Sequence, residues 1–115
     1  MLMIRIGKAH DDIIGIDVSK HAVKRSEDDD LYTLVCAGIS TVAVGLCNAL
    51  DQLAPGQCEI DFVSDEQDPG ALNHITITVK QNSLDLQQIM KTGAIQLETA
   101  AESYQDYIDF KITEV

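Results

Sequence analysis

Five stretches of the sequence alternate between apolar and polar residues with a period of two, most clearly at 75–79 (ITITV) and 108–112 (IDFKI). A strand with this pattern turns its apolar side chains to one face, which is typical of an antiparallel or mixed sheet covered on one side. The predicted strands are 2–6, 12–18, 58–63, 74–79 and 107–113. Residues 7–11 are expected to join the first two strands as a hairpin.

Two longer stretches follow the helical period. The first has an apolar stripe of Val35, Ile39, Val42, Leu46, Ala49 or Leu50, and Leu53, and Pro55-Gly56 ends it. The second has the stripe Leu86, Met90, Gly93, Leu97 and Ala101, with Asn82 or Ser83 as its N-cap. The order strand-strand-helix-strand-strand-helix-strand predicts one α+β domain over residues 1–115. Two helices would cover one face of a five-stranded mixed or antiparallel sheet.

The first predicted helix is rich in small residues, among them Gly38 and Gly45. Glycine inside a helix costs about 1 kcal/mol relative to alanine. The two glycines therefore suggest that a backbone approaches closely, from the sheet or from a second subunit, with ordinary packing as the favoured explanation.

The chain is strongly acidic: 8 Lys and Arg stand against 19 Asp and Glu, a net charge of −11. Direct binding to nucleic acid needs a basic surface and is not expected, whereas basic partners are favoured. No apolar run is long enough to predict a membrane span, and the alternating start indicates a strand and not a signal peptide. The sign of the charge changes within residues 24–30 (KRSEDDD).

Cys36 differs from the other two cysteines by its position. With Thr33 as N-cap, it falls in the first helical turn, where unpaired backbone N–H groups and the helix dipole favour a thiolate. Ser40 lies one turn later on the same face. Cys47 and Cys58 are expected to be small buried hydrophobic residues. No cysteine spacing predicts a zinc site or a disulfide framework.

His21 follows the second predicted strand and begins the connection that leads to Cys36. At that place a histidine could act as the general base of a Cys–His pair. The alternative is an exposed loop histidine, and position alone favours it. His10 and His74 are expected at the surface.

Around these residues the chain resembles the Prp family of ribosomal-processing cysteine proteases. Members read Gly-His-Ala-Gly after the second strand and Asp-Ile-Val-Cys-Ala-Ala-Val-Ser at the start of the first helix. Residues 20–23 (KHAV) and 33–40 (TLVCAGIS) stand at these places, and 46–50 (LCNAL) resembles the Val-Asn-Ala-Leu stretch that follows. The resemblance covers nearly the whole chain in element order and length.

The resemblance implies a cytoplasmic, homodimeric cysteine protease that needs no metal or cofactor. Such enzymes remove a short N-terminal extension from a large-subunit ribosomal protein, so the implied partner is that basic N-terminal segment. Carried over, Cys36 would be the nucleophile, His21 the general base and Ser40 a supporting residue. An acidic surface would attract a basic segment of this kind, and the acidic run before Cys36 is expected to help hold it.

Three departures from the family pattern keep a second function open. Lys20 and Val23 replace glycines and restrict the backbone. Thr33 replaces an aspartate; it can cap the helix, but it cannot supply a carboxylate that orients His21. Asp30 is a candidate substitute because the loop is longer than usual. The alternative is a catalytically weak or inactive homodimeric module that binds a basic ribosomal or assembly partner.

Overall fold

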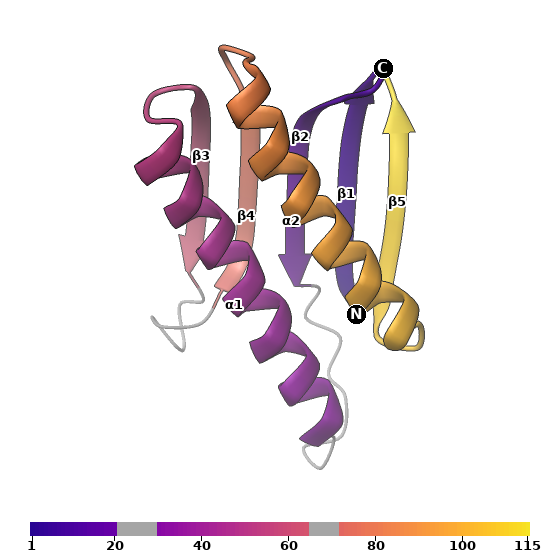
Figure 1. The fold of residues 1–115 in the computed structure, drawn as a ribbon. Helices are drawn as coiled ribbons and strands as arrows, with labels where there is room; N and C mark the ends of the chain where they lie inside the picture. The colour runs from indigo at the N-terminus through magenta and orange to yellow at the C-terminus, as the bar shows by residue number, and fades with distance from the viewer. Residues whose placement is uncertain (21–29, 65–71) are drawn as a thin grey trace.

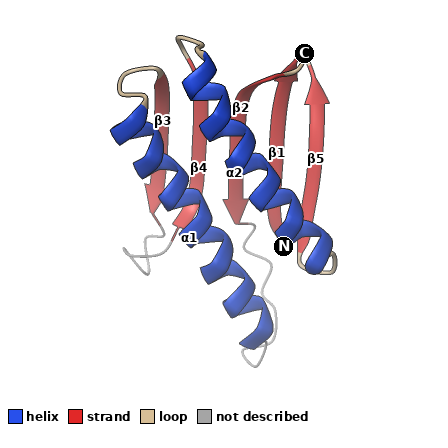
Figure 2. Cartoon of the chain, in the orientation of Figure 1, coloured by secondary structure: helices blue, strands red, loops and turns tan. Residues whose placement is uncertain are grey.

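The structure is a computed structural model, and it describes residues 1–20, 30–64 and 72–115. Seven elements follow one another in the predicted order (Figure 1). They are β1 (Leu2–Ala9), β2 (Asp12–Lys20), α1 (Asp30–Leu53), β3 (Cys58–Ser64), β4 (Leu72–Val79), α2 (Leu84–Ser103) and β5 (Ile108–Glu114). Figure 2 shows both helices on the same side of the sheet. The predicted α+β two-layer fold is confirmed.

The sheet is mixed, with the strand order β3-β4-β2-β1-β5. Every neighbouring pair is antiparallel except β1 and β5, which run parallel. A parallel pair needs a long crossover connection, and α2 lies in the segment that leads into β5. The last strand of the sheet therefore pairs with the first strand of the chain.

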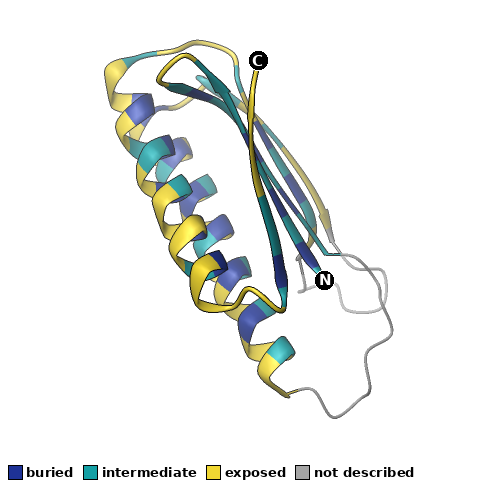
Figure 3. Ribbon diagram, turned by 90° about the vertical axis from the view of Figure 1, so that its right-hand side faces the viewer, coloured by how far each residue is buried: buried dark blue, intermediate teal, exposed yellow. Residues whose placement is uncertain are grey.

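The core lies between the sheet and the two helices, as the burial pattern in Figure 3 shows. The alternation predicted for the strands sets which side chains enter it: Leu2, Ile4 and Ile6 of β1 are at most 2% exposed. The stripe predicted for α2 is buried throughout and Ser83 is its N-cap, so both predictions are confirmed. On α1 the prediction for Leu53 is wrong. This residue is 68% exposed because the helix ends there and the chain buries Ala54 instead.

The two helices pack on each other where Leu46 of α1 lies over Gly93 of α2. An added Cβ at Gly93 would come within 2.7 Å and 2.8 Å of the two methyl carbons of Leu46. The glycine is therefore required by close packing between helices. Gly38 and Gly45 have no such contact, since an added Cβ at either meets nothing within 4 Å.

The hairpin of β1 and β2 is fastened to α2 through a buried glutamine. Its turn is shorter than predicted and includes His10, which is exposed and has a positive φ of 57°. A bulge shifts the register next to Gly7, where Lys8 pairs with Ile13. Gln87 accepts from the Ile13 N–H at 2.8 Å and donates to the Ile13 carbonyl at 2.9 Å. These bonds satisfy backbone groups beside the bulge that would otherwise be costly to bury.

Helix α1 is more apolar than the sequence analysis allowed. It has 24 residues, and its most apolar window reaches a mean hydropathy of 1.8, so length and composition alone would let it cross a bilayer. Its buried residues form a stripe that packs on the sheet and on α2, which is typical of a core helix. The expectation that no apolar stretch is long enough to span a membrane is thus corrected by α1. The expectation that the protein has no membrane partner stays a prediction.

Replacing Gly93 with alanine should destabilise the fold by about 1–2 kcal/mol, because overpacking against Leu46 outweighs the gain in helix propensity. Urea denaturation should show this as a lower midpoint with an unchanged slope. Thr92→Ala, on the exposed side of the same turn, should stay within about 0.5 kcal/mol of the parent. A parent-like midpoint for Gly93→Ala would contradict the close packing.

Candidate active site

Cys36 lies deeper in its helix than the sequence predicted. Helix α1 begins at Asp30 and not after Thr33, so Cys36 is its seventh residue and lies in the second turn. The effect of the helix dipole falls off within the first turn. The predicted position in the first helical turn is therefore wrong, and the helix dipole gives this thiol little support.

The neighbours of Cys36 on the helix follow from its spacing. Tyr32 and Thr33 are one turn before it and Ser40 is one turn after it, so all three border the thiol along one side of α1. Cys36 is partly buried against the core, Ser40 is half-buried and Thr33 is exposed. The structure thus places Cys36 beside Ser40, as predicted.

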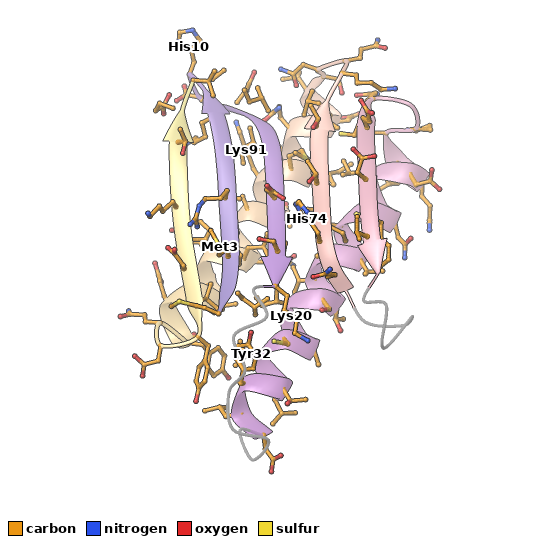
Figure 4. The ribbon with its side chains drawn as sticks, turned by 180° about the vertical axis from the view of Figure 1, so that it is seen from behind. Met3, His10, Lys20, Tyr32, His74 and Lys91 are labelled. Carbon is orange, nitrogen blue, oxygen red and sulfur yellow. The ribbon has the colours of Figure 1, made fainter. Side chains whose placement is uncertain are left out.

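An aromatic contact holds this half of α1 against the rest of the molecule. The rings of Tyr32 and Tyr107 lie with their centroids 5.8 Å apart and are tilted by 36°. Tyr107 directly precedes β5, so the contact joins the start of α1 to the start of the last strand. In Figure 4, Tyr32 and Lys20, the last residue of β2, are both labelled toward the lower end of the molecule. The end of β2 and the thiol-bearing part of α1 therefore lie at the same end of the sheet.

Two other predicted site residues have different outcomes. His21 lies outside the described residues, so its pairing with Cys36 stays a prediction. Asp30 is the exposed first residue of α1, where a carboxylate stabilises the positive end of the helix. It precedes Cys36 by six residues, which is about 9 Å along the axis and on a different side of the helix. Asp30 therefore does not border the thiol.

The other two thiols are held in a less reactive state. Burial raises the pKa of the Cys47 thiol, and the nearby Cys58 raises it further. Burial also raises the pKa of Cys58, and Lys80 offsets part of that rise. Both residues are half-buried and pack against the core, so their predicted role as small hydrophobic residues agrees with their environment.

The uncovered face of the sheet holds a polar cluster that the sequence analysis missed. His74 Nε2 lies 2.5 Å from Asp17 Oδ1 and 3.0 Å from the Thr76 hydroxyl, which donates to the same Asp17 oxygen at 3.2 Å. His74, labelled in Figure 4, was expected as a simple surface residue and is only half exposed. Both partners meet the same ring nitrogen, so the cluster cannot relay a proton through the imidazole.

Nothing in residues 1–20, 30–64 and 72–115 forms a metal site, because no three His, Cys, Asp or Glu side chains converge there. The chemistry that the described residues can offer is that of a partly exposed thiol next to a hydroxyl. A thiol in this setting can act as a nucleophile when a base removes its proton.

The sequence model of the family described as cysteine protease Prp matches residues 1–109 of this chain. The chain belongs to the Prp family of cysteine proteases. The match spans all seven elements apart from the end of β5, and it includes the whole of α1 with Cys36. Among curated proteins, none matches the sequence significantly.

Solved structures show the same fold over almost the full length. SMU.848 from Streptococcus mutans superposes with a TM-score of 0.74 at 18% identity, covering 100% of this chain and 96% of that one. The essential ribosomal processing protease Prp from S. aureus, in complex with a covalently linked product peptide, gives a TM-score of 0.72 at 24% identity. The same protease in complex with a substrate peptide gives 0.71 at 23%. Each S. aureus comparison covers 98% of this chain and 100% of the other.

The raised pKa values of Cys47 and Cys58 lead to a test of the thiols. Because only the thiolate reacts, both cysteines should be alkylated by iodoacetamide more slowly than free cysteine near neutral pH. Their rates should climb as the pH rises toward the raised pKa. Digestion with chymotrypsin, which cuts after leucine and aromatic residues, places the three cysteines in different peptides, so that mass spectrometry measures each site separately. Protein unfolded in urea, in which all three cysteines should react alike, is the control. Fast labelling of Cys47 or Cys58 in the folded protein would contradict the burial.

Proposed function

We propose that this protein is a cysteine protease that removes the N-terminal extension of a large-subunit ribosomal protein precursor. Cys36 is its nucleophile and His21 its general base. The observation that carries the proposal is the family match over residues 1–109, together with the half-accessible position of Cys36 next to Ser40 on α1. The S. aureus relative with its covalently linked product peptide supports covalent chemistry in this fold.

The reaction follows from these two groups. His21 takes the proton of the Cys36 thiol, and the sulfur attacks the carbonyl carbon of the scissile peptide bond. The C–N bond breaks as the protonated imidazole gives its proton to the leaving amine, and the extension stays on Cys36 as a thioester. Water, deprotonated by His21, then attacks the thioester, releases the carboxylate and restores the thiol.

The residues around the thiol have supporting roles in this proposal. Ser40, one turn after Cys36, is close enough along the helix to border the reacting carbonyl. Thr33 borders the thiol from the preceding turn and replaces the family aspartate without supplying a charge. Asp30 is the first residue of α1, and an orienting role toward His21 would require His21 to lie near the helix start.

The net charge of the chain and its family membership support the proposed substrate, oligomeric state and cellular location of the enzyme. A chain with a net charge of −11 attracts the basic N-terminal segment of a ribosomal protein and repels nucleic acid. The same family membership supports a homodimer that works in the cytoplasm without metal or cofactor.

Cleavage of the precursor tests the proposal directly. The ribosomal protein precursor from the same cell should lose its extension when incubated with the wild-type protein, as read by N-terminal sequencing or intact mass. Cys36→Ala and His21→Ala should each slow the reaction by about 10³-fold or more, because they remove the nucleophile and its base. Cys47→Ala, which removes a thiol elsewhere on the same helix, is the matched control and should cut at close to the wild-type rate.

The outcomes separate the two candidate functions. Cutting by wild type and Cys47→Ala alone supports the protease. Binding of the precursor by all variants without any cutting would overturn it in favour of the inactive binding module. Equal cutting by Cys36→Ala would place the nucleophile on another residue.

The acidic run before Cys36 leads to a separate prediction. Replacing residues 27–30 (EDDD) with Gln and Asn should lower kcat/KM by about 10-fold at low ionic strength, because the long-range attraction of a basic substrate is lost. The deficit should shrink above about 0.15 M salt, where charges are screened within about 8 Å.

A matched control neutralises four exposed acids in other elements: Glu59, Asp61, Asp85 and Glu98. This variant has the same net charge and should lose less kcat/KM than the variant of residues 27–30. Equal losses would mean that only net charge matters and that the acidic run has no special place in substrate capture.

A further inference from the structure

Strand β3 forms one border of the sheet, as Figure 1 shows. It pairs with β4 on one side, and no strand in the described part of the chain pairs with its other side. Such a border presents a row of backbone N–H and C=O groups that can pair with another extended segment. We call the unpaired side of residues 58–63 the free edge of β3.

The direction of the backbone groups along the free edge follows from one hydrogen bond. The Lys80 N–H donates to the carbonyl of Gln57, the residue before β3, at 2.8 Å. Residues along an antiparallel strand bond alternately to one side and to the other. Every second residue counted from Gln57 therefore bonds to β4, and the N–H and C=O groups of Cys58, Ile60 and Phe62 point to the free edge.

The side of the free edge that faces the helices is apolar. Ile60 and Phe62 lie opposite Ile77 and Ile75 of β4, which are buried under the helices. Ile60 packs against the core, whereas Phe62 is 50% exposed at the border of the sheet. An apolar side chain of an added strand would therefore bury part of Phe62.

The other side of the free edge carries two carboxylates without a partner. Glu59 and Asp61 alternate with the apolar residues of β3, so they lie on the uncovered face of the sheet, and both are exposed. Among residues 1–20, 30–64 and 72–115, no cation forms an ion pair with either of them. By contrast, Asp109 of β5 is already bound by Arg5 at 3.0 Å. Two exposed and unpaired carboxylates favour a partner that brings Lys or Arg to matching positions.

We propose that the free edge of β3 binds an extended segment of a partner protein as an additional strand, and that Lys or Arg alternate with apolar residues in this segment. Its backbone pairs with Ile60 and Phe62, and its apolar side chains lie beside Phe62 on the helix side. Its cations lie opposite Glu59 and Asp61. The binding does not use Cys36 and goes beyond the proposed protease function.

Charge favours such a segment over other occupants. A second copy that paired through the same edge would set Glu59 and Asp61 of each molecule against the same acids of the other. Like charges directly opposite each other on neighbouring strands are destabilising. Nucleic acid and anionic lipid surfaces are repelled by the same carboxylates and by the net charge of −11.

The opposite border of the sheet lacks this selectivity. Strand β5 is the other outermost strand, and Asp109 and Lys111 lie on its uncovered side. These two charges have opposite signs, and Asp109 is held by Arg5. The edge of β5 therefore selects neither a basic nor an acidic segment, whereas that of β3 selects a basic one.

Binding of a designed strand tests the proposal. The probe is the acetylated and amidated peptide Thr-Lys-Val-Lys-Val-Lys-Thr with a fluorescent label, followed by anisotropy at about 0.05 M salt, where charges are weakly screened. It should bind the wild-type protein. Joint Glu59→Gln and Asp61→Asn should weaken binding about 10-fold or more, because both carboxylates are lost. Joint Glu98→Gln and Glu102→Gln, which neutralises two exposed acids of α2, is the matched control and should bind like the wild type.

A charge reversal and amide exchange make the test specific for an added strand. Joint Glu59→Lys and Asp61→Lys should prefer the peptide Thr-Glu-Val-Glu-Val-Glu-Thr, which the wild type should not bind. Hydrogen exchange followed by NMR should show the amides of Ile60 and Phe62 slowed about 10-fold or more by saturating probe. The amides of Glu59 and Asp61 already bond to β4 and should change little.

Each other result overturns the inference. Wild-type protein that shows no saturable binding up to about 1 mM probe would rule out the site. Equal weakening in the α2 control would mean that only net charge attracts the peptide. Binding that leaves the Ile60 and Phe62 amides unprotected would rule out strand addition. Cys36→Ala should bind the probe like the wild type, so failed docking and failed cleavage are read separately.

Discussion

The contact of Leu46 with Gly93 determines where the first helix lies. Only glycine at position 93 leaves room for both methyl groups of Leu46. The contact therefore sets the distance between α1 and α2 at this point. Helix α2 is fixed in turn by Gln87, which binds both backbone groups of Ile13 at the bulge of the first hairpin. The position of Cys36 thus depends on a chain of contacts from the first hairpin through α2 to α1.

Helix α1 faces three different environments around its circumference. One side is a core stripe, a second carries Cys36 and Ser40, and a third is exposed but has no charged residue between Asp30 and Asp51. An ordinary surface helix has one apolar side and one charged side. The apolar composition of α1, which approaches that of a membrane span, therefore extends beyond the stripe that the core needs, while the rest of the chain is acidic.

The sequence was sufficient to predict the architecture, because each strand of a sheet that is covered on one side alternates between buried apolar and exposed polar residues. Each strand was found within a few residues, and the α2 stripe was found completely. The start of α1 was misplaced because Thr33 is an acceptable N-cap by residue type, whereas in the structure it lies inside a helix that already begins at Asp30. The His74, Asp17 and Thr76 cluster was missed because it depends on which residues of β2 and β4 face one another. That register is not encoded in the alternation of either strand alone.

The parallel pairing of β1 with β5 has a consequence for synthesis. Strand β1 is made first and has β2 on one side, but its other edge stays open until residues 108–114 have been made. Leu2 donates to Tyr107 and Val115 donates to Lys8, so the two edges are joined at both ends only by the last part of the chain. Native pairing of β1 during synthesis is therefore incomplete until β5 has been made. Until then, the N–H and C=O groups along that edge of β1 lack their native partners.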